Sequence, residues 1–317
     1  MTEHFLTCDR KNLHGTFDAS LSPVLRVEPG DRVRFSTLDG DWHIAPQQTP
    51  RTGSGTYFTP KKLPDDAGHA LIGPIYVNGA HPGDTLEVRI LSLTPGAWGW
   101  SRTGGPANVH TRRLNIPEGE EHYLLWSLDN ERMRATSNEG HTVAMDPFLG
   151  VLGTAPNREG MISTHPPGSH GGNLDCRALT PGSTLYLPVF HEGALFSAGD
   201  GHARQGDGEA GGTAIECPMQ DVLLELNVCK GLLRDMPYAK TADAYIAFGF
   251  DEDLTRAAYQ ALEGIVSILQ ALYGFARTEA LSMSSLVCDL RITQIVNGIR
   301  GVHAILPLNA IASIENP

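Results

Sequence analysis

Apolar and polar residues alternate in several short segments, and a turn precedes three of them. These three are VEPGDRVRF from Val27, AHPGDTLEVRI from Ala80 and LTPGSTLYLPV from Leu179. In each, proline sets φ for a turn and the next glycine accepts the positive φ that a type II turn requires. The alternation that follows is typical of a half-buried strand, and DVLLELNV from Asp221 repeats it. Turn signals between short strands favour an antiparallel β-sandwich or jelly roll.

The pattern becomes helical near the C-terminus. Residues 251–274 place apolar groups three and four positions apart, which predicts a helix with Asp251 as its N-cap and Gly274 as its end. Thr278 is expected to cap a second helix, and DLRITQIV (289–296) alternates like a strand. Between about 95 and 175, the many Gly, Pro, Asn and His residues predict long irregular connections.

These elements predict one mainly β unit over residues 1–317, with a β-sandwich or jelly-roll-like core and a helical pair near the C-terminus. A chain of this length can bury a substantial core. We divide the unit into a β-rich part, 1–245, and a C-terminal α+β part, 246–317.

Composition narrows the class of partner. The 317 residues are 41% hydrophobic and 19% charged, which is typical of a folded protein. A formal net charge of −12, without a cluster of Lys and Arg, argues against nucleic-acid binding. Five scattered cysteines without a CxxC pair indicate a reducing compartment. Because no stretch reaches the length of a membrane span, we predict a cytoplasmic protein that binds neither nucleic acid nor membrane.

The segment GDGHARQGDGEAGGTAIE (199–216) combines six glycines with two aspartates, two glutamates and a histidine. Three of the glycines match GxGxxG, but a dinucleotide site needs a helix after this motif and no nearby carboxylates. A solvated loop has no need of six positions without a β-carbon. We therefore expect a tightly folded backbone that brings the acidic groups and the histidine together.

Asp200 and His202 are two positions apart, so an extended backbone projects both to one side. A carboxylate beside an imidazole suits a catalytic zinc or a similar divalent ion. Glu216 begins the strand-like run after the loop and can face the same space. The alternative is that these are ordinary polar residues of a surface loop.

A second polar stretch lies at residues 165–183, where His170, Asn173 and Asp175 surround a Gly-Gly pair. Its alternative interpretation is an Asx-rich turn that leads into the next strand. Cys176 is expected to be a buried, inert thiol. His43 is expected to be a surface histidine or a core histidine with satisfied hydrogen bonds.

Taken together, these stretches resemble the acetamidase/formamidase family of small-amide hydrolases. The resemblance is carried by GPIYVNGAHPGDTLEV (73–88), PFLGVLGTAP (147–156), HGGNLDCRALTPGSTLYLPV (170–189), GALFSAGDGHARQGDGEAGGTAIE (193–216) and DLRITQIV (289–296). It implies hydrolysis of a short linear carboxamide of the formamide or acetamide type to carboxylate and ammonia. It also implies a β-sandwich-like core, a bound divalent metal and a homodimer or larger homo-oligomer.

The resemblance further implies that the two polar stretches meet across one pocket. The residues expected to bind the metal are Asp175, Asp200 and His202, with zinc as the first expectation and calcium as the second. The residues expected to be catalytic are Glu216, Asp175 and His202, one of the two carboxylates taking a proton from water. The residues expected to bind the amide substrate are His170, Asn173 and Glu209.

Three alternatives stay open at this point. In the first, the enzyme hydrolyses a cyclic amide or another compound with a carbon–nitrogen bond. In the second, the protein is a non-catalytic jelly-roll binding module that holds a structural ion. In the third alternative, Cys176 or Cys217 acts as a covalent nucleophile.

Overall fold

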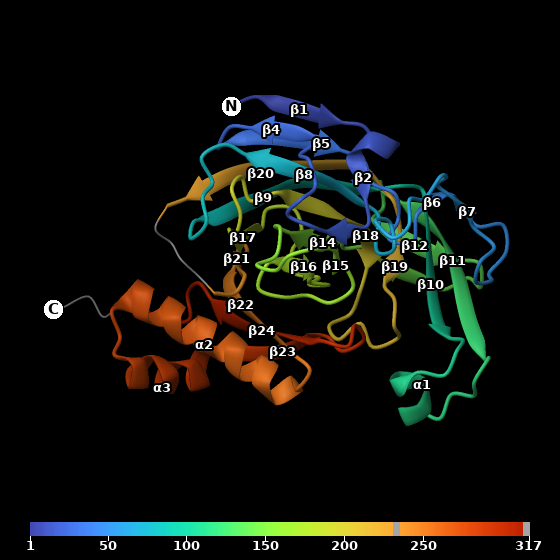
Figure 1. The fold of residues 1–317 in the computed structure, drawn as a ribbon. Coiled ribbons are helices and arrows are strands. Elements are labelled where there is room, and N and C mark those ends of the chain that lie inside the picture. Colours follow the sequence, from blue (N-terminus) through green and yellow to red (C-terminus); the bar gives the residue numbers. More distant parts are fainter. Residues whose placement is uncertain (231–234, 313–317) are drawn as a thin grey trace.

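The computed structural model describes residues 1–230 and 235–312 and is built mainly of strands, with two helices near the C-terminus. This confirms the predicted fold class. Two large sheets form the body of the molecule, and helices α2 and α3 lie together on one side of it (Figure 1). None of the helices in these two ranges combines the length and the apolar character that a membrane crossing requires.

The first sheet has nine strands and joins segments from both ends of the chain. Its order is β1 (Glu3–Leu6), β5 (Asp31–Phe35), β20 (Met219–Cys229), β9 (Thr85–Pro95), β17 (Thr184–Pro188), β21 (Tyr238–Lys240), β22 (Ala244–Asp251), β24 (Arg300–Pro307) and β23 (Asp289–Gln294). The three segments with a Pro-Gly turn thus supply β5, β9 and β17, as the alternation predicts. The sheet also continues across residue 245, where we divide the chain, so the two predicted parts share one sheet.

The second sheet has eleven strands and carries the candidate site. Its main path is β13 (Thr142–Ala144), β12 (Arg134–Ser137), β11 (Glu121–Asp129), β10 (Trp98–Gly104), β19 (Ile215–Glu216), β18 (Phe196–Arg204), β14 (Phe148–Gly153) and β16 (Gly171–Asn173). Strand β8 (Leu71–Val77) pairs with β18 and also with β2 (Leu13–His14) and β4 (Leu25–Val27).

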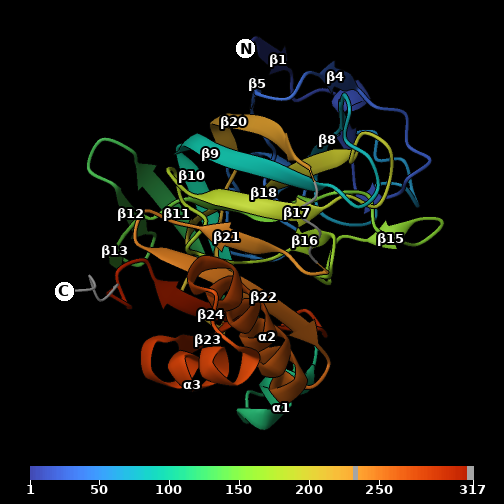
Figure 2. The same ribbon diagram turned by 90° about the vertical axis from the view of Figure 1, so that its left-hand side faces the viewer.

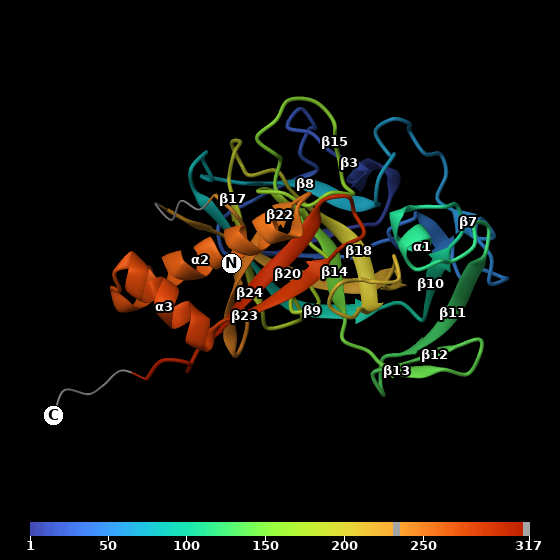
Figure 3. The ribbon, with the colours of Figure 1, turned by 90° about the horizontal axis from the view of Figure 1, so that it is seen from below.

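Small elements complete the fold. They are two two-stranded sheets, β3 (Thr16–Phe17) with β15 (Ile162–Ser163) and β6 (His43–Ala45) with β7 (Thr56–Tyr57), the 3-10 turn η1 (Arg10–Asn12) and the short helix α1 (Val109–Arg113). Helix α1 lies well away from the C-terminal helices (Figure 3).

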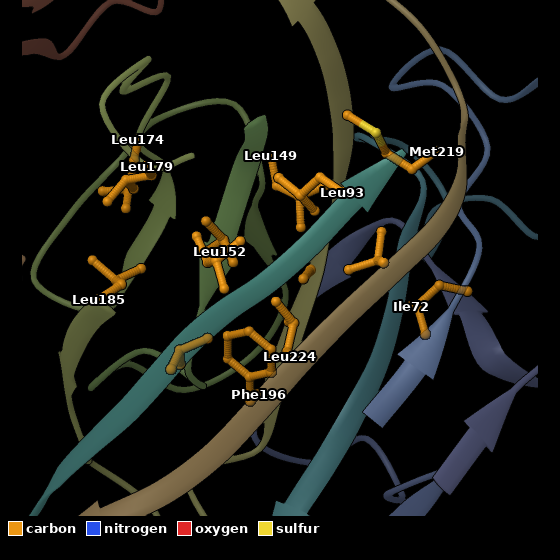
Figure 4. Close-up of a cluster of buried hydrophobic side chains, with 14 of the residues drawn as sticks. Ile72, Leu93, Leu149, Leu152, Leu174, Leu179, Leu185, Phe196, Met219 and Leu224 are labelled. Atoms are coloured by element: carbon orange, nitrogen blue, oxygen red, sulfur yellow. The ribbon is translucent and has the colours of Figure 1, made fainter. Parts of the chain in front are cut away.

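The main core fills the space between the two sheets. Leu93 of β9 and Leu224 of β20 belong to the same buried cluster as Leu149 and Leu152 of β14 and Phe196 of β18 (Figure 4). These side chains are at most 8% exposed. The alternating apolar residues of both sheets therefore interdigitate, as in a β-sandwich.

Helix α2 (Leu254–Tyr273) covers strands β22 and β24, and α3 (Arg277–Val287) packs beside it (Figure 2). Gly274 ends α2 in the left-handed conformation, as predicted. The predicted N-cap is wrong by two residues: Asp253 accepts hydrogen bonds from the first turn, while Asp251 accepts one from the Asp253 N–H. Thr278 is likewise no cap, because α3 already begins at Arg277.

The prediction of irregular structure between about 95 and 175 is wrong for much of that region. Strands β10 to β16 lie within it, and β10 and β11 form a long antiparallel pair. Glycines and polar residues obscure the alternation there because part of this sheet is exposed on both faces. Cross-strand pairing, which a single segment does not reveal, stabilises these strands.

The glycine-rich segment also differs from the expected loop, since its first six residues belong to the buried strand β18. A β-carbon on Gly199 would overlap the carbonyl oxygen of Ala70, and one on Gly201 would lie 2.5 Å from that of Cys217. These two glycines therefore allow neighbouring backbones to approach closely.

Three buried histidines make stability depend on pH. Burial lowers the pKa of His14, His170 and His303 to about 4. In the unfolded chain a histidine titrates near 6.5, so between that pH and about 4 the unfolded state binds protons that the folded state does not bind. We expect each of these histidines to lower the free energy of unfolding by up to about 3 kcal/mol as the pH falls from about 6.5 to about 4.

The measurement is urea unfolding of wild type and His14→Asn between pH 7.5 and pH 5. His14 Nδ1 lies 2.7 Å from the carbonyl oxygen of Thr16, a contact that an asparagine amide can keep. The variant should lose less stability on acidification than wild type. Equal losses in the two proteins would contradict the assignment to His14.

Candidate active site

The candidate site lies where strand β18 changes its neighbour on one edge. Strand β14 follows one edge of β18 from Ser197 to His202. On the other edge, β8 pairs with β18 up to Gly199, and β19 pairs with it from His202 onward. Asp200 occupies the break between these two partners and has a φ of 60°. Strands β14 and β18 lie side by side near the C-terminal hairpin (Figure 3).

The imidazole of His202 is the centre of a buried polar cluster. Its Nε2 lies 3.1 Å from Glu216 Oε2 and 3.5 Å from Asp200 Oδ2, and its Nδ1 lies 4.0 Å from Asp175 Oδ1. The four residues are between 1% and 6% exposed. Glu216 also accepts a hydrogen bond from the Ala214 N–H at 2.9 Å through Oε1, which fixes its carboxylate.

Asp175 reaches this cluster from the segment after β16, with help from residues distant in the sequence. Asn297 Nδ2 donates to Asp175 Oδ2 at 2.7 Å, and Gln205 Nε2 donates to the Asp175 carbonyl oxygen at 2.8 Å. Asn297 follows β23, so the C-terminal part of the chain orients this carboxylate. The sequence analysis misses both residues, because no local pattern connects them with Asp175.

Glu209 lies beside Asp175 and is 7% exposed. The adjacent Gly208 is held on both sides: its N–H donates to the Thr293 carbonyl oxygen, and its carbonyl oxygen accepts from the Ile295 N–H. Glu209 has a φ of 46°, as does Asp175. Positive φ is uncommon in residues other than glycine, and such strained residues cluster at functional sites.

The charges of the cluster shift its proton affinities in opposite directions. Burial raises the pKa of Asp175 to about 6, against the opposing effect of His202. Burial would also raise the pKa of Asp200, but the charges of His69 and His202 hold it well below its usual value. Asp200 is therefore the carboxylate that stays ionised most readily.

The other two acids retain protons more readily than usual. Burial, reinforced by the charge of Asp175, raises the pKa of Glu209 well above its usual value. Burial raises the pKa of Glu216, partly offset by His202. For His202, burial disfavours the imidazolium, but Glu216 and Asp200 outweigh it and hold its pKa well above its usual value. A cation among these four carboxyl groups would favour their ionised forms.

The residues Asp175, Asp200 and His202 fit a metal ion. One ligand atom from each lies within 4.8 Å of the others. Asp175 Oδ1 and His202 Nδ1 are buried, and neither has a hydrogen-bond partner among the described residues. A β-carbon on Gly150 would overlap Asp200 Oδ2 and lie 2.8 Å from both Asp175 Oδ1 and His202 Cε1. The three side chains thus converge on a space that the missing β-carbon leaves free.

The structure brings some of the predicted residues together and separates one. Asp175, Asp200, His202, Glu209 and Glu216 form the cluster. Asn173 lies nearby: its Nδ2 donates to the His165 carbonyl oxygen at 3.1 Å, and its buried Oδ1 lacks a described partner. His170 instead packs edge-on against Phe17 and lines a different cavity of about 330 Å³.

The cysteines and His43 do not supply the chemistry of this cluster. Burial raises the pKa of Cys176 to about 12 and also raises that of Cys217, so neither thiol ionises readily. His43 is a satisfied core histidine, as expected: Nδ1 lies 2.6 Å from Asp39 Oδ2 and Nε2 lies 3.2 Å from Gln47 Nε2.

Two histidines that the sequence analysis misses lie on the outer side of Asp200. The rings of His69 and His165 are 4.6 Å apart, and both affect the pKa of Asp200. His69 lies two residues before the start of β8, which is paired with β18 at Gly199. Only this pairing between distant strands brings His69 to the site, so no local signal points to it.

Comparisons with known proteins agree with this geometry. A model of the Acetamidase/Formamidase family matches residues 2–165 and 159–312. A formamidase of Methylophilus methylotrophus is 27% identical over 272 residues, covering 70% of this chain and 64% of that protein. The chain therefore spans just under two thirds of this curated relative.

Two solved structures are similar over almost their entire length. The acetamidase of Bacillus halodurans is 30% identical, with a TM-score of 0.83 and coverage of 96% of this chain and 97% of the other. The acetamidase of Yersinia enterocolitica is also 30% identical, with a TM-score of 0.84 and coverage of 98% and 93%. Together with the family match, these similarities show that the chain belongs to the acetamidase/formamidase family.

Proposed function

We propose that this protein is a metal-dependent amidase that hydrolyses short linear carboxamides to a carboxylate and ammonia. The observation that carries the proposal is the convergence of the Asp175 and Asp200 carboxylates and the His202 ring on the space beside Gly150, with Asp175 Oδ1 and His202 Nδ1 buried and without a described partner. The names of the relatives, formamidase and acetamidase, support the substrate class. Zinc suits two carboxylates and an imidazole better than calcium, which prefers oxygen ligands throughout.

Asp175, Asp200 and His202 would hold the ion. When bound, such an ion polarises the amide carbonyl and makes a nearby water more acidic. Glu216 Oε2 accepts from His202 Nε2–H, which directs the unpartnered Nδ1 toward Asp175 Oδ1. Because both oxygens of Glu216 have partners, we assign it to positioning His202 rather than to proton transfer.

Glu209 is the better candidate for moving the proton. Its Oε2 is buried without a described partner, and burial together with the charge of Asp175 raises its pKa well above its usual value, which favours the protonated carboxyl group. Hydrolysis breaks the carbon–nitrogen bond, forms a carbon–oxygen bond to water and requires a proton on the leaving nitrogen. Glu209 would donate that proton and regain one from water, a role usually worth about 10²–10⁴-fold in rate.

The decisive experiment measures metal content and ammonia release on the same wild-type preparation. Formamide, acetamide and a γ-lactam are offered to the protein before and after chelation, and again after zinc is restored. We expect about one equivalent of metal, ammonia release from the two linear amides, loss on chelation and recovery with zinc. Full activity after complete removal of metal would overturn the metal-dependent scheme.

Two other results would change the proposal in defined ways. Faster turnover of the γ-lactam than of either linear amide would favour a cyclic-amide hydrolase. Stoichiometric metal without turnover of any amide would favour a binding module. A cytoplasmic location and a homo-oligomeric assembly stay predictions.

A further inference from the structure

Asp200 directs its two oxygens to different surroundings. Oδ2 points to the space beside Gly150 that Asp175 and His202 share. Oδ1 lies on the side of Gly40, where a β-carbon would overlap it and would lie 3.2 Å from His69 Cδ2. The ring of His69 therefore lies near Oδ1 of Asp200, the oxygen that does not face Gly150.

Thr164 contacts both the backbone and the Nδ1 atom of His69. Thr164 Oγ1 accepts a hydrogen bond from the His69 backbone N–H at 2.8 Å and lies 2.9 Å from His69 Nδ1. The Thr164 hydroxyl can donate to Nδ1 while its oxygen accepts from the backbone. In that tautomer the imidazole proton is on Nε2, where it is available to a ligand.

His69 is more exposed than the cluster beside it. The cluster side chains are buried, His69 is half-buried, and His165 beside it is exposed. The rings of these two histidines meet edge to face at 64°, and the Asn173 amide holds the His165 backbone. The half-buried His69 ring can therefore be contacted from solvent.

We propose that His69 is a catalytic residue whose Nε2–H binds the carbonyl oxygen of the amide as negative charge develops on it. This inference rests on the proposed amidase function. It gives Asn173 and His165 a structural role, since they support the segment that carries Thr164. Removal of one such preorganised donor typically lowers kcat about 10²–10³-fold.

The experiment compares His69→Ala, His69→Gln and Thr164→Val with wild type, measuring kcat, KM, metal content and Tm. His141→Ala is the matched control, because that imidazole is 63% exposed and contacts only Glu139 among the described ion pairs. We expect His69→Ala to lower kcat about 10²–10³-fold with unchanged metal content. His69→Gln, which retains an N–H donor, should recover part of this loss, and Thr164→Val should show a smaller loss than His69→Ala.

Two results would overturn the inference and leave the amidase proposal intact. One is a kcat of His69→Ala within about threefold of wild type. The other is loss of metal from both His69 variants, which would make His69 a ligand or a support of the metal ligands. If wild type hydrolyses no amide, the amidase proposal fails, and calorimetric titration with acetamide tests the donor alone. Weaker binding by His69→Ala than by wild type then supports the donor, and equal binding refutes it.

Discussion

The Asp200→Asn substitution is expected to lower kcat/KM for acetamide by at least about 10³-fold and to reduce bound metal to a trace. The asparagine amide keeps the shape of the carboxylate but removes the negative charge that the cluster retains most readily. It also replaces one carboxylate oxygen by an amide nitrogen, which donates hydrogen bonds and does not bind a metal ion as a carboxylate does. A lost metal ligand removes several kcal/mol of transition-state stabilisation, and each 1.4 kcal/mol is tenfold in rate.

The control for this variant is Asp146→Asn. The Asp146 side chain is 44% exposed, and its nearest ion-pair partner among the described residues, Arg204, is 4.0 Å away. Metal is measured by elemental analysis, turnover by ammonia release and folding by thermal unfolding. If Asp200→Asn keeps its metal and its activity while it folds like wild type, Asp200 is not a ligand and the site assignment is wrong.

Much of the fold could be predicted from the sequence because its signals are local. The Pro-Gly turns and the alternation behind them are properties of ten consecutive residues, and they predict β5, β9 and β17 correctly. The pattern of helix α2 and its end at Gly274 are equally local. Strands β10 and β11 were not predicted, because pairing with each other stabilises them more than any alternation of their own.

The residues of the candidate site that could be predicted are likewise those with a local sequence signal. Asp200 and His202 share one strand, so their spacing already places them together. Asp175 and Glu216 are recognisable as polar residues at the ends of patterned segments. Asn297 and His69, by contrast, reach the site only through the contacts of the C-terminal turn with Asp175 and of β8 with β18. No spacing in the sequence encodes those contacts, which is why sequence reasoning missed both residues.

The glycines around the site show that residue type alone does not reveal whether a glycine bends the chain or allows close packing. A high glycine content was interpreted as bending, yet Gly199 and Gly201 lie in an extended strand. Their role is to let β18 approach the backbones of Ala70 and Cys217. Only knowledge of the neighbouring strands distinguishes a glycine that turns the chain from one that makes room beside it.

Substitution of Gly150 tests whether Asp175, Asp200 and His202 bind an ion in the space that its missing β-carbon leaves free. A β-carbon there would overlap Asp200 Oδ2 and approach Asp175 Oδ1 and His202 Cε1 to 2.8 Å. Because φ at Gly150 is outside the left-handed region, alanine suits the backbone itself. We therefore expect Gly150→Ala to fold and to bind zinc with an affinity lowered at least about 100-fold. At limiting zinc, its activity should fall in proportion to the metal that it loses.

Gly206→Ala is the matched control for that variant. Gly206 also has a φ outside the left-handed region, and no atom lies within 4 Å of its added β-carbon. Zinc affinity is measured by competition with a chromogenic chelator, and folding by urea unfolding. If Gly150→Ala binds zinc as tightly as Gly206→Ala, the ion does not lie between Asp175, Asp200 and His202. If Gly150→Ala instead unfolds, the space beside Gly150 is needed for packing, and the loss of zinc then says nothing about ligands. His202→Ala distinguishes loss of a ligand from loss of packing, because it removes a proposed ligand and adds no atoms. The proposed ligand set requires that this variant also loses zinc.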